Sequence, residues 1–147
     1  MVFRGNFSAK VDAQGRLKIP TAHRKLLEEE YGPELFVTSV TGNHVLIYPL
    51  TEWESIEGRL LEPPKMRPAK TKFLRNTAYF GQVSSMDRQG RVLIQPHLRE
   101  SAAMEGEVAV IGYLNYLEVW NKERFQKLLH EDAYTQEDAA ALADLGI

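Results

Sequence analysis

Two stretches of the sequence, VDAQGRLKIP at residues 11–20 and SMDRQGRVLIQP at residues 85–96, carry the same short pattern. Each contains Asp-x-Gln-Gly-Arg, followed by a short apolar run and a proline. The shared residues are Asp12, Gly15 and Arg16 in the first copy, and Asp87, Gly90 and Arg91 in the second, 75 positions later. Arg24 and Arg99 keep the same offset. Because similarity persists through several further segments, the pattern indicates a tandem duplication.

Each copy predicts the same order of short elements. In the first copy, two strand-like runs flank a Gln-Gly turn, which predicts a hairpin or a loop. Gly15 and Gly90 suit a backbone with positive φ at that turn. A short helix follows and ends near Gly32, and two further strands come after it. The predicted ranges are Phe7–Val11 and Leu17–Ile19 for the first strands, Pro20–Gly32 for the helix, and Leu35–Val40 and Val45–Tyr48 for the later strands.

The helices that close the two copies are expected from their caps and apolar stripes. Thr51–Glu54 reads as a capping box, and it precedes an apolar face that a proline pair ends. That face consists of Trp53, Ile56, Leu60 and Leu61, with Pro63–Pro64 behind it. Asn121 is the expected N-cap in the second copy, ahead of an apolar stripe of Phe125, Leu128 and Leu129. Residues 63–70 resemble a linker, residues 71–80 a short helix, and Thr135 the cap of a last helix.

Neither copy is long enough to bury much of its own surface. Two duplicated β units therefore pack most economically against each other around a pseudo-two-fold axis. We expect an α+β chain with a mainly β core and helices around it. The expected units are residues 5–50, residues 77–122 and a helical extension at residues 123–147.

The charge of the chain is unevenly distributed. The net charge is −2, which alone argues against a nucleic-acid partner. Residues 1–25 and 65–91, however, carry +5 and +6, whereas residues 26–64 and 92–147 carry −7 and −6. Each basic block contains one of the Asp-x-x-x-Arg turns, so the averaged charge conceals two concentrated cationic segments.

The composition excludes several classes of protein. No run approaches the roughly 18–20 apolar residues of a membrane span, and the first residues lack the apolar core of a signal peptide. The sequence has no cysteine, which rules out disulfides and thiolate metal sites. We expect a cytoplasmic protein that is associated with the nucleoid.

The Asp-x-x-x-Arg turn has two interpretations. In the structural one, the carboxylate accepts backbone N–H groups across the turn and pairs with the arginine. In the binding one, the same turn holds the guanidinium outward, toward a phosphate or a guanine edge. The repetition and the neighbouring cations favour binding. These cations are Arg4, Lys10, Lys18 and Arg24 near the first turn, and Lys70, Lys72, Arg75 and Arg88 near the second.

Enzymatic chemistry finds no support in the sequence. His23, His44, His97 and His130 lack the spacing of a metal site and read as ordinary surface or helix-end histidines. No Gly-rich phosphate loop or GxSxG motif occurs. Asp12 and Asp87 each have a cation four residues on, which keeps both ionised, whereas a general acid needs the reverse. We expect no enzyme activity, no metal and no cofactor.

Three segments of the chain together resemble one family. They are MVFRGNFSAKVDAQGRLKIP at residues 1–20, RNTAYFGQVSSMDRQGRVLIQPHLRE at residues 75–100 and YLEVWNKERF at residues 116–125. They resemble MraZ, a family of bacterial transcriptional regulators of the division and cell-wall gene cluster with two SpoVT/AbrB-like domains in one chain. The likeness covers nearly the whole chain, and the doubled Asp-x-x-x-Arg is its specific signature. The C-terminal end carries no recognisable motif.

The resemblance implies a fold, an assembly and a ligand. The fold is a tandem pair of swapped-hairpin, AbrB-like β units with helices around them. Members of the family form ring-shaped homo-oligomers and bind short, repeated, G-rich boxes upstream of their own operon, usually as repressors. Carried onto this sequence, the DNA contacts are Arg16 and Arg91, with Asp12 and Asp87 shaping the turns. Gln14 and Gln89 stand where many members have lysine.

We therefore expect a homo-oligomeric regulator that binds double-stranded DNA, with no membrane and no small-molecule substrate. In addition to the two turn arginines, the residues expected to contact DNA are Lys10, Lys18, Arg4 and Arg88, and the glycines expected to shape the turns are Gly15 and Gly90. The competing interpretation is an oligomeric scaffold whose basic turns bind an acidic protein partner.

Overall fold

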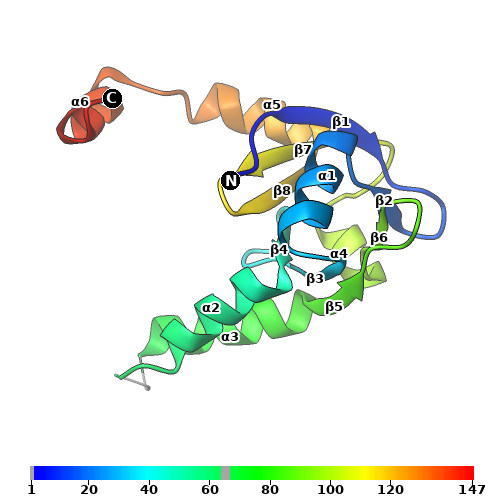
Figure 1. Cartoon of the computed structure of the whole chain (residues 1–147). Helices are drawn as coiled ribbons and strands as arrows, with labels where there is room; N and C mark the ends of the chain where they lie inside the picture. Colours follow the sequence, from blue (N-terminus) through cyan, green and yellow to red (C-terminus); the bar gives the residue numbers. More distant parts are fainter. Residues whose placement is uncertain (1, 64–66) are drawn as a thin grey trace.

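Strands and helices from both sequence copies interleave in the computed structural model, which describes residues 2–63 and 67–147 (Figure 1). The elements in chain order are β1 (Asn6–Lys10), β2 (Arg16–Lys18), α1 (Thr21–Glu30), β3 (Glu34–Thr38), β4 (Val45–Pro49), α2 (Leu50–Leu60), α3 (Pro68–Phe80), β5 (Gln82–Ser85), β6 (Arg91–Leu93), α4 (Pro96–Ser101), β7 (Glu107–Tyr113), β8 (Tyr116–Asn121), α5 (Lys122–Glu131), α6 (Gln136–Leu142) and the 3₁₀ helix η1 (Ala143–Leu145). The fold is α+β, as the sequence predicted.

The main sheet has six antiparallel strands in the order β1-β7-β8-β4-β3-β5. Its two central strands, β8 and β4, occupy equivalent places in the two copies, and so do β7 and β3, and the edge strands β1 and β5. Equivalent strands therefore follow in the same order from either edge of the sheet. Each copy lends its first strand to the other, since β1 pairs with β7 and β5 pairs with β3. This is the expected pseudo-two-fold arrangement.

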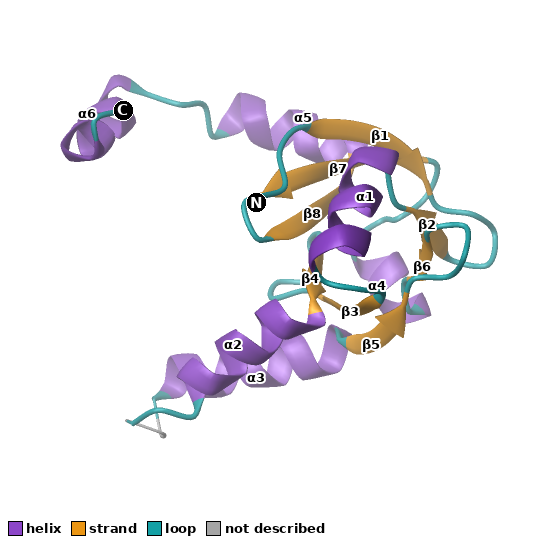
Figure 2. Ribbon diagram, in the orientation of Figure 1, coloured by secondary structure: helices purple, strands orange, loops and turns teal. Residues whose placement is uncertain are grey.

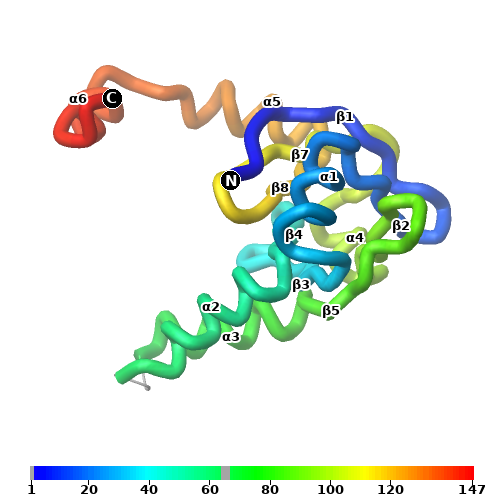
Figure 3. Tube along the Cα trace, in the orientation of Figure 1, coloured from blue at the N-terminus to red at the C-terminus, as the bar shows by residue number. Residues whose placement is uncertain are grey.

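The strands that follow the two turns form a separate two-stranded ribbon. β2 pairs antiparallel with β6 of the other copy, with Leu17 opposite Val92. β1 and β2 are joined only by the isolated bridge between Val11 and Leu17. The Gln-Gly turn of each copy is therefore a loop between strands that pair elsewhere. Figure 3 shows the blue and green segments of these distant parts of the chain lying side by side.

One hydrophobic core serves both copies. Leu17 and Val92 from the ribbon are fully buried, together with Ile94 and Leu98 of the second copy and Leu27 of the first. Each fully buried aliphatic side chain of this kind contributes about 1.5–3 kcal/mol relative to an exposed one. Because these side chains belong to a single cluster, the two copies stabilise each other.

A second, smaller apolar cluster fastens the α2–α3 pair to the sheet. Trp53 of α2 is buried, and it stacks on Phe36 of β3 at 4.7 Å between ring centroids and on Phe73 of α3 at 5.9 Å. Beyond this cluster the two helices project from the body (Figure 2). Trp53 and Ile56 pack as the stripe predicted, but the prediction for Leu61 was wrong, because that side chain lies exposed past the end of α2.

Two of the three predicted helix caps are confirmed. The Asn121 side chain accepts a hydrogen bond from the Arg124 N–H at the start of α5. Thr135 and Asp138 form a complete capping box at α6. The capping box at Thr51 was wrong: α2 begins at Leu50 with Pro49 as its N-cap, which forms no side-chain hydrogen bond, so Thr51 already lies in the first turn.

The helix expected over residues 71–80 is confirmed as part of α3. Of the linker predicted at residues 63–70, residues 64–66 lie outside the described residues. The prediction was wrong for residues 68–70, which form the start of α3 behind the N-cap Arg67. The boundaries of the two predicted units, residues 5–50 and 77–122, and of the extension at 123–147 stay predictions. In the described residues no helix has the length and apolar character needed to cross a membrane.

The description of the histidines as surface or helix-end residues was wrong for His23. This side chain is 2% exposed and lies edge-on to the rings of Phe3 and Phe7. Burial lowers the pKa of His23 below its ordinary value, because the core solvates the imidazolium poorly. His23 therefore acts as a core side chain of α1.

Candidate nucleic-acid interface

The first turn is organised by the carboxylate of Asp12. Its Oδ1 accepts hydrogen bonds from the backbone N–H groups of Gln14 and Arg16, both at 2.9 Å. Its Oδ2 accepts from Arg16 Nε at 3.3 Å. The Arg16 guanidinium also donates to the Gln14 side-chain oxygen. One carboxylate thus closes the loop and orients the arginine that follows it.

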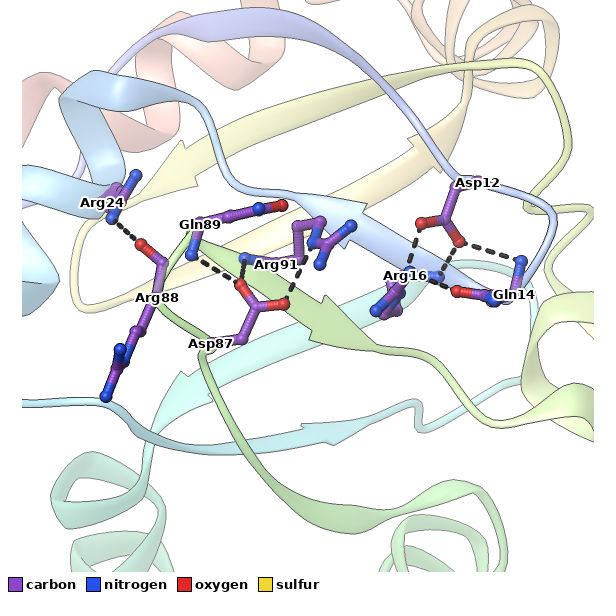
Figure 4. A network of polar contacts seen from close by, with 8 residues as sticks. All are labelled: Asp12, Gln14, Arg16, Arg24, Asp87, Arg88, Gln89 and Arg91. Atoms are coloured by element: carbon purple, nitrogen blue, oxygen red, sulfur yellow. Dashed lines mark hydrogen bonds and ion pairs between the residues drawn. The ribbon is translucent and has the colours of Figure 1, made fainter.

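The second turn repeats this geometry closely. Asp87 Oδ1 accepts from the N–H groups of Gln89 and Arg91 at 2.9 Å, and Oδ2 accepts from Arg91 Nε at 3.0 Å. Figure 4 shows the Asp12 and Asp87 clusters at the two ends of the ribbon. The bond from the Arg91 N–H lowers the pKa of Asp87, and the bond from the Arg16 N–H lowers that of Asp12. Both carboxylates are therefore ionised at neutral pH.

The glycine at the tip of each turn is required by two constraints. Gly15 and Gly90 have φ of +83° and +76°, a region that disfavours other residues. A Cβ at Gly15 would also lie 2.4 Å from Cζ of Arg99, and one at Gly90 would lie 2.7 Å from Cδ of Arg24. Each turn therefore packs directly on an arginine of the other copy.

These cross-copy contacts hold the turns in place. The Ile19 N–H donates to the Gly90 oxygen, and the Ile94 N–H donates to the Gly15 oxygen, both at 2.9 Å. Arg24 of α1 donates from Nη2 to the carbonyl oxygen of Arg88 at 2.6 Å. The placement of Arg24 beside the first turn was therefore wrong, because the swap carries this arginine to the second turn.

The ribbon collects three cations on one outward face. Successive side chains of a strand point to opposite sides, and directly opposed residues of an antiparallel pair share a side. Leu17 and Val92 point inward to the core. Lys18 is opposite Arg91, and Arg16 is opposite Leu93. Arg16, Lys18 and Arg91 therefore share the outer face, which we call the ribbon face, together with the exposed Leu93.

The other predicted contact residues lie at different distances from this face. Lys10 lines one shallow hollow with Lys18. Arg88 is exposed within the second turn. Arg4 precedes β1, and Lys10 lies at the other end of that strand. Lys70, Lys72 and Arg75, which sequence reasoning grouped with the second turn, belong to α3.

Leu93 was missed as a member of the ribbon face. It is 41% exposed, although it sits in an apolar run that reads as core. The alternation of Val92, Leu93 and Ile94 could have found it, since only the flanking two residues are buried. In the described residues no three His, Asp or Glu side chains gather in a way that could hold a metal ion.

Two interlocked copies of a swapped β unit, each with a turn in which an aspartate holds an arginine, define a tandem AbrB-like protein. Comparison with known families makes this assignment specific. The MraZ family model, described as "MraZ protein, putative antitoxin-like", matches residues 2–76 and 82–145. The chain belongs to the MraZ family.

Curated relatives align with nearly the whole chain. Transcriptional regulator MraZ of Acidobacterium capsulatum is 47% identical over 146 residues, which cover 99% of this chain and 100% of the relative. The protein of the same name from Koribacter versatilis is 42% identical over 147 residues, with 99% and 100% covered. That from Syntrophobacter fumaroxidans is 37% identical over 134 residues, with 90% and 89% covered. The family carries the name of a regulator, not of an enzyme.

Proposed function

We propose that this protein is a transcriptional regulator that binds double-stranded DNA through the ribbon face. The observation that supports it most is the presence of Arg16, Lys18 and Arg91 on one side of a two-stranded ribbon. The major groove of B-DNA is wide enough to admit such a ribbon. The relatives of this chain are named transcriptional regulators.

The two arginines supply base recognition in this proposal. A guanidinium held by a carboxylate loses little further freedom on binding, and it can form a bidentate pair with guanine O6 and N7. Such a pair contributes roughly 1–3 kcal/mol of discrimination against other bases. Lys10, Lys18 and Arg88 contact phosphates and fix the register of the ribbon on the duplex.

Self-assembly multiplies these contacts. One chain offers few cations, so we propose a ring-shaped homo-oligomer that binds several short G-rich boxes at once. Once one box is bound, the next binds at the high effective concentration set by the DNA between them. Acting on repeated boxes upstream of its own division and cell-wall operon, in the cytoplasm at the nucleoid, the assembly serves as a repressor.

The experiment is a gel shift with DNA from directly upstream of this protein's gene, compared with a scrambled duplex of equal length. Specific binding of the upstream DNA is expected. The observed association constant should also fall steeply with salt, because each neutralised phosphate contributes about −0.9 to the logarithmic slope. Equal affinity for both duplexes, or a flat salt response, contradicts the proposal and favours a scaffold that binds an acidic protein.

A further inference from the structure

The chain ends in a segment that packs on nothing within the described residues. We call residues 132–147 the C-terminal arm; it contains α6 and η1. Every residue of the arm is exposed except Leu142, which is half-buried. In Figure 1 the arm stands away from the body beyond α5. The hydrogen bonds of α6 and η1 run within the arm itself.

An exposed helix of this length does not persist by itself. α6 has 7 residues, whereas isolated helices shorter than about 12–15 residues are marginal in water. Its capping box nevertheless specifies where the helix begins. The arm therefore carries a defined helix whose stability must come from packing against a surface outside it.

The arm has the chemistry of a docking segment. Ala139, Leu142 and Ala143 fall at helical spacing on one side of α6 and η1. Leu145 and Ile147 follow and are 71% and 79% exposed. The arm has four acids and no base, a net charge of −4, and the acids are Asp132, Glu137, Asp138 and Asp144. Such a segment is repelled by DNA and fits a surface that is both apolar and cationic.

Helix α3 presents a surface of that kind. Lys72, Arg75 and Tyr79 lie at i, i+3 and i+7 along one exposed stripe, with Leu74 and Ala78 beside it. Tyr79 is 65% exposed, and Leu74 is also exposed. Within residues 2–63 and 67–147, neither Lys72 nor Arg75 forms an ion pair. We call these five residues the α3 surface.

We propose that the C-terminal arm docks on the α3 surface of a second copy of this chain. The charges are opposite, and both partners offer apolar side chains that their own chain leaves uncovered. In Figure 1 the arm leaves the body at the end of α5, while α2 and α3 project from a different part of it. The arm thus lies apart from its own α3, and a contact between an arm and an α3 surface joins two copies.

The geometry of this contact has a consequence for assembly. Each copy gives its arm to one neighbour and receives an arm from another, which makes the interface heterologous. Heterologous interfaces generate rings when the rotation closes. The inference thus deepens the homo-oligomer of the proposed function and identifies the surfaces that join its subunits.

Charge reversal tests the contact in the full chain. One variant carries Asp132→Lys, Glu137→Lys and Asp144→Lys in the arm, which changes the net charge of the arm from −4 to +2, and the other carries Lys72→Glu and Arg75→Glu on α3. Asp138 is left in place because it belongs to the capping box. Matched controls are Glu54→Lys with Glu57→Lys on α2, and Lys25→Glu on α1, all at exposed positions. Glutamate and lysine have similar helix propensities, so the helices should persist.

The readout is the mass in solution from sedimentation velocity, at one protein concentration. We expect an assembled wild type and assembled controls. Each reversed variant should shift toward the 16.8 kDa of a single chain. An equimolar mixture of the two reversed variants should reassemble, because both arm-to-α3 pairings in an alternating ring are then complementary. Rescue by mixing would not follow from simple unfolding.

Other outcomes overturn the proposal. These are a monomeric wild type, a reversed variant that keeps the wild-type mass, or a mixture that stays dissociated. Binding of each variant to a duplex with a single box separates this result from the DNA proposal. A dissociated variant that still prefers the box leaves DNA recognition intact. An arm variant that binds DNA more tightly at unchanged mass shows instead that the arm covers the ribbon face of its own assembly.

Discussion

The first and second turns share one geometry but differ in what surrounds them. In both, a single carboxylate accepts two backbone N–H groups at 2.9 Å and orients the arginine four residues on. Around this shared frame the side chains have diverged. Lys18 of the first copy corresponds to Leu93 of the second, and Ala13 corresponds to Arg88. Both copies have thus kept the carboxylate that orients the arginine, whereas the neighbouring side chains differ between them.

The two turns are also braced differently. The second turn rests on Arg24, which forms an ion pair with Glu28 at 2.8 Å and donates to the Arg88 oxygen. The first turn rests on Arg99, whose Nε is buried and has no hydrogen-bond partner among residues 2–63 and 67–147. The residue equivalent to Glu28 is Ala103, so the corresponding carboxylate is missing. The second turn is therefore the more firmly held of the two.

The largest effect is expected from alanine at the turn glycines. Gly15→Ala and Gly90→Ala each place a side chain in the left-handed region of the backbone. This should lower the free energy of unfolding by about 1–2 kcal/mol. Gly90→Ala should destabilise more, because its Cβ meets Arg24, which Glu28 and the Arg88 oxygen fix. Urea unfolding of both variants measures the difference. An equal or greater loss for Gly15→Ala would show that Arg99 is held as firmly as Arg24.

The next largest effect on stability is expected from removal of the arginines on which the turns rest, Arg24 and Arg99. Arg24→Ala deletes the hydrogen bond to the Arg88 oxygen and should lower the free energy of unfolding by about 1 kcal/mol. Arg99→Ala deletes no equivalent bond and should cost less. Thermal unfolding compares them, with Lys25→Ala on the exposed side of α1 as a control. A larger loss of unfolding free energy for Arg99→Ala would show that the first turn is held more firmly than the second.

Exchange of Lys18 and Leu93 tests whether the two copies contact DNA differently. Lys18→Leu gives the first copy the residue of the second, and Leu93→Lys does the opposite. If both positions face phosphates, the logarithmic salt slope of binding should change by about 0.9 in opposite directions. Titrations at several salt concentrations measure it. An unchanged slope in both variants would place these positions away from the DNA backbone.

The smallest effect concerns a buried position of α1. His23 corresponds to Leu98 in the second copy. Since burial lowers the pKa of His23, its neutral form favours the folded state, and stability is lost as the pH falls below about 6.5, the ordinary value. His23→Leu should flatten the decline in unfolding free energy between about pH 6.5 and 5. An identical decline in the wild type and the variant would assign the pH dependence to other groups.

Most elements of the fold could be predicted from the sequence, but the pairing of the strands could not. The repeated spacing predicted the α+β class and the two-fold arrangement, and the caps at Asn121 and Thr135 followed from local hydrogen bonding. The partner of β2 could not be predicted. The alternation of Arg16, Leu17 and Lys18 buries Leu17 in the same way whether β2 pairs with β1 or with β6. The start of α2 was missed because the helix begins at Leu50, one residue ahead of the cap that the pattern at Thr51 predicted.

The candidate site was predicted unevenly for the same reason. Bonds within a turn depend on residues a few positions apart, so Asp12 and Arg16 could be grouped from their spacing. Contacts across the swap join residues far apart in sequence, and no local pattern shows that Arg24 rests on Gly90. The ribbon face combines both kinds of information, because it needs the pairing of β2 with β6 before Lys18 and Arg91 become neighbours.

The most direct measurement is DNA binding by the double variant Arg16→Ala, Arg91→Ala, with oligomer mass and unfolding followed in parallel. Both side chains are only partly buried and point away from the core, so the variant should keep the fold and mass of the wild type. Its preference for the upstream DNA over a scrambled duplex should disappear. If that preference survives in the folded double variant, the ribbon face is not the surface that reads DNA.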